Sequence, residues 1–366
     1  MKRTPFYHTE LAIGASMSSA GFIQPTKFTN SLDEHNAMRE HVGICDFSGM
    51  GEIDVKGTGA RQFLDEHCVN KVSTLKPGRI VYTTILNENA EIIEDATIFC
   101  HSDTHFWVVT TAPQRIPIFD WLTKESEGKD VWVTDISAGT ALLSVQGPES
   151  RKMLTDIVPA VADMKFFGFA QTTVAGIPAL VSRTGYTGEL GYEIYMDVDV
   201  AHDIWDALAE AGKPFNVKYC GTNATVVTLA VEKGFLSLRE YGDKRNPLEV
   251  GLDWTIQWDK PFFVGKAKLE ELRKNGTAEM LMGFIVDDEK AVIPMTADVF
   301  VDGQQVGKVT SACYGPTVKK NIGICHIASE FARIGQRIQL KTNDGMKDAT
   351  IADKTFYDPE KLRPRG

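Results

Sequence analysis

The glycine-rich segment 182–195, SRTGYTGELGYEIY, holds the residues of this chain best suited to chemistry. Apolar runs at 178–181 and 192–196 flank it, which predicts a strand, a tight loop and a second strand. The segment carries the ring of Tyr186 and the carboxylates of Glu189 and Glu193, and no GxxxxGK[ST] phosphate-binding motif occurs in the chain. Carboxylates beside an aromatic face favour a planar ligand with N–H donors, such as a pterin. The alternative is an ordinary hairpin with solvated carboxylates.

The sequence gives little indication of a metal site or of a nucleotide-binding site. The six cysteines form no CxxC pair and are expected to be reduced, buried and inert. His101 and His105 have a spacing used by metal ligands on helices, but the Ser-Asp-Thr between them favours a turn, so we expect no metal site. Gly57-Thr-Gly59 lacks the third glycine of a dinucleotide-binding turn.

The length and the net charge of the chain limit the number of domains and the classes of partner. The chain has 366 residues, which predicts two or three domains, and a net charge of −10, which argues against nucleic acid or an anionic membrane as a partner. No apolar run approaches the roughly 20 residues of a membrane-spanning helix. The first residues lack the apolar core of a signal peptide, so we expect a cytoplasmic protein.

The elements that must position these residues follow from periodicity and from turn residues. Helices are expected at 32–44, 60–67, 117–126, 201–212 and 222–233, and strands at 51–57, 80–86, 92–100, 105–111 and 140–146. From residue 276 the chain changes to short strands separated by Gly and Asp-Gly turns, which predicts a small C-terminal β-barrel.

Seven segments, in order, resemble those of the glycine cleavage system T-protein family, the folate-dependent aminomethyltransferases. They are RTPFYHTELAIGASM, HVGICDFSGMGEIDVKG, VYTTILNENAEIIEDATI, SVQGPES, SRTGYTGELGYEIY, NPLEVGLDWTIQWDKPFFVGKAKL and GKVTSACYGPTVKKNIGICHI. The resemblance extends from residue 3 to about Tyr357. It implies a multidomain α+β and α/β fold, a three-domain ring with a C-terminal β-barrel around a central folate channel.

The resemblance also implies domain boundaries. A discontinuous folate-binding α/β domain would comprise 1–49 and 141–272. An inserted α/β domain at 50–140 would carry the acidic hairpin, and the barrel would occupy 276–366.

Site roles are implied by the same resemblance, with tetrahydrofolate as the cofactor. The family match points to Asp95 as the catalytic carboxylate and to Glu193 as the acceptor for the N–H groups of the pterin. Positions expected near the folate are Tyr82, Tyr186, Met50, Thr110 and Glu94. Because neighbouring residues of a strand point to opposite faces, only one of Glu94 and Asp95 can line the pocket, and we expect Asp95.

The chain also departs from the family pattern. The family's Gly-Leu-Gly-Ala-Arg-Asp and Arg-Leu-Glu-Ala-Gly are replaced at 220–234 by a stretch without either arginine, although Glu232 and Gly234 keep their register. Leu-Ser-Leu-Arg-Glu-Tyr-Gly at 236–242 replaces the family's Leu-Tyr-Gly. Loss of two guanidinium groups removes bidentate donors, so the groups that face the one-carbon donor are expected to differ.

These residues predict an enzyme that transfers a one-carbon unit to tetrahydrofolate. The reading we place first is demethylation of a small onium or methoxyl compound to give 5-methyltetrahydrofolate, with Trp254 and Tyr241 as a cation-accepting wall. The alternative is an aminomethyltransferase that takes its carbon from a lipoyl carrier protein and gives 5,10-methylenetetrahydrofolate and ammonia. A non-catalytic folate-binding assembly factor is a third reading, but the reactive-cysteine motif expected of one is missing.

Overall fold

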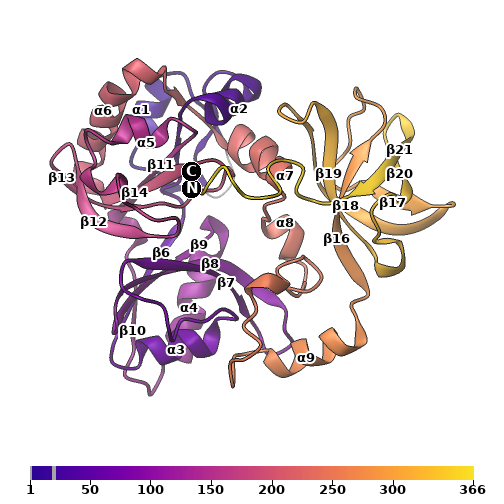
Figure 1. Ribbon diagram of the computed structural model, residues 1–366, viewed down its shortest axis with the longest axis horizontal. Coiled ribbons are helices and arrows are strands. Elements are labelled where there is room, and N and C mark those ends of the chain that lie inside the picture. The colour runs from indigo at the N-terminus through magenta and orange to yellow at the C-terminus, as the bar shows by residue number, and fades with distance from the viewer. Residues whose placement is uncertain (1, 19–21) are drawn as a thin grey trace.

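The computed structural model describes residues 2–18 and 22–366, and its two large open sheets and one closed barrel are arranged around the middle of the molecule (Figure 1). The C-terminal end of the chain lies beside the sheet that contains β11 and β14 (Figure 1). In the described part of the chain, no helix combines the length and apolar character that crossing a membrane requires.

The first sheet has six strands in the order β12-β13-β14-β11-β5-β15, antiparallel except where β15 runs parallel to β5. Its strands are β5 (Gly43–Asp46), β11 (Thr140–Gln146), β12 (Phe169–Val174), β13 (Ile177–Ser182), β14 (Gly191–Asp197) and β15 (Lys218–Tyr219). The associated helices are α1 (Tyr7–Ala12), α2 (Ser31–Glu40), α5 (Ser150–Leu154) and α6 (Ala201–Gly212). Alternate residues of β14, namely Tyr192, Ile194 and Met196, enter the core under α5 and α6.

The second sheet has five strands in the order β10-β6-β9-β8-β7, all antiparallel. They are β6 (Gly51–Lys56), β7 (Arg79–Leu86), β8 (Ile92–Ser102), β9 (His105–Thr110) and β10 (Trp132–Asp135). The helices α3 (Ala60–His67) and α4 (Arg115–Glu125) pack on one face. The other face meets the first sheet through a shared cluster that includes Phe99, Val109, Leu142 and Tyr195.

The C-terminal part is a closed barrel of antiparallel strands in the order β16-β19-β18-β17-β20-β21. Its strands are β16 (Glu279–Val286), β17 (Asp298–Val301), β18 (Gln304–Gly315), β19 (Lys320–Ala328), β20 (Arg337–Thr342) and β21 (Gly345–Ala352). Closure occurs where β16 pairs with β21, and the barrel has its own apolar core. The predicted C-terminal barrel is therefore confirmed.

The segment between the first sheet and the barrel carries several short helices. They are the π-helix η6 (Asn223–Leu229), α7 (Ala230–Lys233), α8 (Leu238–Tyr241) and α9 (Lys266–Asn275). One continuous helix was expected at 222–233; the structure instead begins it as a π-helix, and Gly234 ends it in the left-handed conformation at φ 68°.

This connecting segment bonds to the five-stranded unit. The N–H of Ile92 donates to the carbonyl of Arg245, and the N–H of Gln257 donates to that of Val69. The ammonium of Lys260 bonds to the carbonyls of Asp65, Cys68 and Asn70. The domain boundaries given above stay a prediction, and these contacts place the second half of 141–272 against 65–92.

Two further differences concern the N-terminal region. The helix expected at 32–44 ends at Glu40, because Val42 and Ile44 belong to the apolar core of the first sheet and β5 already begins at Gly43. Short strands that were not expected also form. They are β1 (Lys2–Arg3), paired with β3 (Phe22–Ile23), and β2 (Ser16–Met17), paired with β4 (Pro25–Lys27).

Candidate active site

Asp95 lies in β8 between two tyrosine hydroxyls. Tyr82 on the paired strand β7 donates to Oδ2 at 2.8 Å, and Tyr241 of α8 donates to Oδ1 at 2.6 Å. Burial raises the pKa of Asp95, while the two hydroxyl donors stabilise its ionised form and oppose that rise. The carboxylate is therefore held in place as an acceptor in a poorly solvated setting.

Glu94 occupies the neighbouring position and is completely buried. It accepts the backbone N–H of Thr111 at 2.5 Å and the hydroxyl of Thr111 at 3.2 Å. Burial, followed by the adjacent charge of Asp95, raises the pKa of Glu94 well above its usual range. The half-buried Asp95 thus shares its side of the hairpin with Tyr82, whereas Glu94 binds the chain after β9. Which of the two carboxylates lines the folate pocket stays a prediction.

The position of Tyr241 depends on a well-capped short helix. Ser237 and Glu240 form a capping box at the start of α8, and Ser311 of the barrel donates to Glu240 Oε1 at 2.6 Å. Tyr241 is completely buried with its hydroxyl on Asp95, so the expected role of this residue in an open cation-accepting wall is wrong. A buried phenol that serves a carboxylate offers no open ring face.

Trp254, the other residue of that expected wall, is 56% exposed and stacks on Tyr82 with ring centroids 5.8 Å apart. The ammonium of Lys361 lies 4.9 Å from its ring centroid. The exposed face of Trp254 thus already has a cationic neighbour from the C-terminal tail.

Tyr186 reaches the same region from the glycine-rich loop. Its ring stacks on Phe235 at a centroid distance of 5.2 Å, and its hydroxyl donates to the carbonyl of Leu236 at 2.5 Å. Burial raises the pKa of Tyr186 well above its usual range, and the charge of Asp95 adds to this effect. The loop and the acidic hairpin, about 90 residues apart in the sequence, therefore meet near Asp95.

Glu193 lies on β14, on the face that turns away from the helices. It accepts the hydroxyl of Thr184 at 2.5 Å and that of Tyr195 at 3.3 Å, both on Oε2. Burial raises the pKa of Glu193, and these hydroxyls oppose the rise. The lone pairs of Oε1 leave acceptor capacity for the N–H groups of a ligand.

A buried arginine orders the glycine-rich loop, and sequence reasoning missed it. Arg39 of α2 donates to the carbonyl of Thr187 at 2.7 Å, to Glu189 at 3.2 Å and to Glu232 at 3.0 Å. Its guanidinium also lies 4.0 Å from the ring centroid of Tyr357. Glu189, expected to offer its carboxylate to a ligand, is therefore committed to an internal ion pair. An isolated arginine on a polar helix carries no pattern that would have identified this role.

Met50 and Thr110 are the two remaining positions expected near the folate. Met50 packs against the apolar cluster at the junction of the two sheets. Thr110 is completely buried, and its Oγ1 lies on the face of β9 that meets Gly51 and Arg115 of α4. Strand alternation thus separates Thr110 from the face that carries Asp95, and its expected contact with folate stays a prediction.

The two histidines with metal-ligand spacing interact with each other and with a carboxylate. The rings of His101 and His105 stack 4.4 Å apart, and His105 Nε2 lies 2.6 Å from Asp54 Oδ1. Within the described residues, no group of three or more His, Cys, Asp or Glu side chains is arranged to hold a metal ion.

Comparison with known families gives this arrangement a context. The family model of the GCVT N-terminal domain matches residues 6–260, and that of the glycine cleavage T-protein C-terminal barrel domain matches residues 280–358. The chain belongs to the glycine cleavage T-protein family. An aminomethyltransferase from Thermoanaerobacter sp. (strain X514) is 34% identical to it over 98% of both chains. One from Caldanaerobacter subterraneus subsp. tengcongensis is 35% identical over 98% of this chain and 96% of the relative.

A solved T-protein has the same fold. The glycine cleavage system aminomethyltransferase T from Bartonella henselae superposes with a TM-score of 0.90 over 98% of both chains, at 24% identity. The multidomain T-protein fold with its C-terminal barrel is thereby confirmed. As a T-protein family member, the chain is a tetrahydrofolate-dependent methyl- or aminomethyltransferase.

Proposed function

We propose that this T-protein family member is an aminomethyltransferase that transfers a one-carbon unit from a lipoyl carrier protein to tetrahydrofolate. The observation that carries the proposal is 34–35% identity to curated aminomethyltransferases over nearly the whole length of both partners. This reverses the order expected from the sequence, where demethylation came first. The location in the cytoplasm, expected from the sequence, belongs to the same proposal.

The reaction balances without an added oxidant or reductant. The carbon of an S-aminomethyl group forms two new bonds, to N5 and N10 of tetrahydrofolate, and loses its bonds to sulfur and to nitrogen. The thiol and ammonia leave with the two protons that N5 and N10 give up. Positive charge therefore develops around the transferred carbon, where an ionised carboxylate stabilises it.

We assign that role to Asp95. Its two tyrosine donors favour the ionised form and fix both of its oxygens, so little reorganisation is needed when charge develops. Glu193 supplies a buried acceptor for the pterin N–H groups, and Tyr82 and Tyr186 supply aromatic surface. This set of acceptors and aromatic rings fits tetrahydrofolate.

Folate-dependent demethylation is the second candidate, and one observation favours it. The π-helix η6 and α7 carry no arginine, and Glu232, which keeps the family register, pairs with Arg39 from α2. A one-carbon donor that carries no group for an arginine to bind, such as a small onium compound, would be compatible with this loss of arginine. The methyl carbon would then move to N5, which releases its proton.

A product assay separates the two candidates. Purified protein and tetrahydrofolate are incubated with an aminomethyl-loaded lipoyl carrier protein and, separately, with a panel of methylated onium and methoxyl compounds. We expect 5,10-methylenetetrahydrofolate and ammonia from the carrier alone, measured by mass spectrometry. Formation of 5-methyltetrahydrofolate from a panel member would make demethylation the function. Folate binding without either product would favour the non-catalytic reading.

Two substitutions test the residue roles. Asp95→Asn should lower kcat by at least about 100-fold with little effect on folate affinity, because it removes the charge that stabilises the transition state. Glu193→Ala should weaken folate binding by roughly 1–3 kcal/mol, since pterin N–H groups lose their acceptor. The exposed Glu127→Gln is the matched control and should change neither quantity. Normal folate affinity in Glu193→Ala would remove Glu193 from the site.

A further inference from the structure

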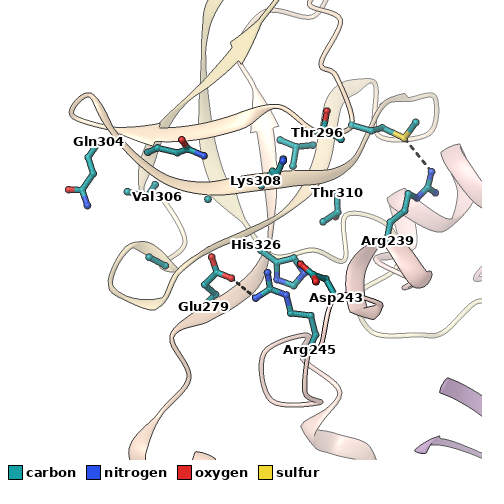
Figure 2. A pocket seen from close by; sticks show the side chains of 15 residues that line it. Arg239, Asp243, Arg245, Glu279, Thr296, Gln304, Val306, Lys308, Thr310 and His326 are labelled. Atoms are coloured by element: carbon teal, nitrogen blue, oxygen red, sulfur yellow. Dashed lines mark hydrogen bonds and ion pairs between the residues drawn. The ribbon is translucent and has the colours of Figure 1, made fainter. Parts of the chain in front are cut away.

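A cavity of about 930 Å³ lies between the barrel and the stretch that begins with α8. Its walls come from β16, β18 and β19 on one side and from residues 239–245 on the other (Figure 2). None of the residues assigned to folate lines it. One of its lining residues, Arg239, belongs to the stretch where this chain departs from the family pattern.

The cavity carries an excess of positive charge, although the protein as a whole has a net charge of −10. Arg239, Arg245 and Lys308 line it together with Asp243 and Glu279. Arg245 pairs with Glu279, as the dashed line in Figure 2 shows. Two cations are thus left opposite a single carboxylate.

These two cations have weak partners within the described chain. Arg239 bonds only to the hydroxyl of Ser237 and to the sulfur of Met295, and Lys308 takes part in no ion pair among the described residues. A carboxylate in the cavity would gain charge-assisted hydrogen bonds from both without breaking any ion pair.

His326 adds a second requirement that a ligand of the cavity must meet, a hydrogen-bond donor. It is 5% exposed, and its Nε2 lies 2.7 Å from the carbonyl oxygen of Glu240. A carbonyl only accepts, so Nε2 carries the hydrogen and Nδ1 of the neutral ring is an acceptor. That Nδ1 is buried and has no hydrogen-bond partner among the residues that the structure describes. Burial and the nearby Arg245 lower the pKa of His326, so the ring is neutral at pH 7. Because Nδ1 has almost no exposed surface, an N–H or O–H donor reaches this acceptor only when the side chains around it shift.

We propose that this cavity is a second ligand site, which binds a carboxylate that carries an N–H donor close by, as an acidic amino acid or a glutamyl group does. The carboxylates bind Arg239 and Lys308, and the N–H group binds the unpartnered acceptor of His326, with Asp243 as an additional acceptor. The inference holds for either one-carbon donor.

The site also contacts the same short helix that serves Asp95. The carbonyl of Glu240 accepts from His326, and the next residue, Tyr241, donates to Asp95. A ligand in the cavity therefore binds against the element that positions the tyrosine of the catalytic carboxylate. Two sources supply the ligand chemistry: a free acidic amino acid, or the glutamate tail of a bound folate.

Isothermal titration of the full chain tests the site with two matched probes. L-glutamate and glutarate carry the same two carboxylates, but only glutamate has the ammonium N–H donors. We expect glutamate to bind at least about tenfold more tightly, because glutarate leaves the buried acceptor unpaired. Equal affinities, or no binding of glutamate, would overturn the proposal for a free ligand.

Three variants locate the binding. Lys308→Ala should weaken glutamate binding about tenfold, whereas Lys341→Ala, which removes an exposed barrel lysine outside the cavity, should not. His326→Gln retains a donor to the carbonyl of Glu240 and should abolish the preference for glutamate over glutarate. Equal losses in Lys308→Ala and Lys341→Ala would reduce the effect to general surface charge and sink the idea.

The folate arm distinguishes the source. Tetrahydrofolate with one glutamate and with three glutamates is titrated into wild type and Lys308→Ala. A loss confined to the triglutamate assigns the cavity to the folate tail, and a loss confined to free L-glutamate assigns it to a separate amino acid. If Lys308→Ala changes neither ligand, no such site exists. Failure of the aminomethyl-transfer assay leaves these binding results unaffected, so the two proposals fail separately.

Discussion

At Asp95, two phenols from different elements converge on one carboxylate. Tyr82 comes from the paired strand, and Tyr241 comes from a helix roughly 150 residues further along the chain. Burial favours the neutral acid, and each hydroxyl donor favours the ionised form. The pKa of Asp95 therefore depends on the balance between burial and the two hydrogen bonds, and a single substitution should shift it.

Tyr241→Phe should raise the pKa of Asp95, because it removes a hydrogen bond that stabilises the charged form. Activity that needs ionised Asp95 is lost as pH falls through this pKa, so the acid limb of the kcat/KM profile should move up by about one pH unit. Tyr314→Phe, on the surface of the barrel, is the control. An unchanged acid limb with reduced activity would show that Tyr241 acts only by packing.

A second carboxyl pair lies buried in the N-terminal region. Within residues 2–18 and 22–366, both oxygens of Glu10 lack hydrogen-bond partners, and so does Asp46 Oδ2. Burial, followed by the charge of Asp46, raises the pKa of Glu10 to about 9. The folded protein therefore holds a proton on Glu10 that the unfolded chain releases above pH 4.5. This contribution to stability is complete below pH 4.5 and is lost progressively as pH rises toward 9.

Glu10→Gln should stabilise the protein by about 1–3 kcal/mol at pH 7 to 8, because the neutral amide keeps the shape and has no proton to lose. The gain should vanish at pH 4.5. Urea unfolding at several pH values measures it, and the exposed Glu40→Gln serves as the control. A gain that is the same at every pH would refute the protonated state of Glu10.

Sequence patterns identified some of these residues and missed others. The motifs around Asp95, Glu193 and Tyr186 are contiguous, so their resemblance to the family could be read directly. Arg39 and Glu10 act through partners far away in the sequence, and only the fold brings those partners within reach. Tyr241 was noticed as an aromatic, but its role depends on where α8 ends.

Among the elements, the glycine-rich loop is built around a buried glutamine. Gln146 donates to the carbonyl of Thr184 at 3.1 Å and accepts the hydroxyl of Thr187 at 2.9 Å. A Cβ on Gly185 would lie 2.1 Å from Gln146 Oε1, and one on Gly191 would lie 2.2 Å from the same side chain. These glycines are needed for close approach to Gln146, since side chains there would collide with it.

Gly185→Ala should therefore destabilise the protein by about 1–3 kcal/mol and weaken folate binding, because the loop cannot close on Gln146. Gly139→Ala is a matched control, since a Cβ there meets nothing within 4 Å. Thermal unfolding and folate titration measure both effects. If both variants behave like wild type, the loop can move enough to accommodate a Cβ at Gly185, and the close contact with Gln146 is not needed.

Strands were easier to predict than the connecting segment. The β7–β8 hairpin and the barrel strands have alternating or β-branched residues with clear turn signals, so pattern and structure agree. The segment at 222–242 has short apolar runs that pack against distant parts of the chain, including Leu86 of β7 and Ile324 of the barrel. Tertiary contacts decide its conformation, and no local pattern predicted a π-helix there.

At the scale of the whole molecule, the C-terminal tail ties the barrel back to the first sheet. Lys233 of α7 is almost completely buried, and its ammonium binds Asp358 Oδ2 at 2.9 Å and the carbonyl of Asp358 at 2.7 Å. Arg183, beside the glycine-rich loop, reaches the carbonyl of Pro364 at 3.2 Å. The ring of sheets and barrel is thereby closed by a few polar contacts.

Asp358→Ala should cost about 3 kcal/mol, because it leaves the buried ammonium of Lys233 without its carboxylate. Thermal unfolding measures the loss, and limited proteolysis should show earlier cleavage of the tail. Asp287→Ala, which breaks the exposed pair with Arg337, is the control and should leave Tm unchanged. A tail that stays protected in Asp358→Ala would mean that the apolar contacts of the tail hold it.

The closing contact also sets an order of events during synthesis. Lys233 and Asp358 are 125 residues apart, so a ribosome that adds about 5–20 residues per second needs roughly 6–25 s to deliver the second after the first. Until then the ammonium of Lys233 has no carboxylate partner, and Arg39 has no Tyr357 to stack on. We therefore expect the nascent chain to complete both sheets early and to acquire folate affinity only after the barrel has emerged.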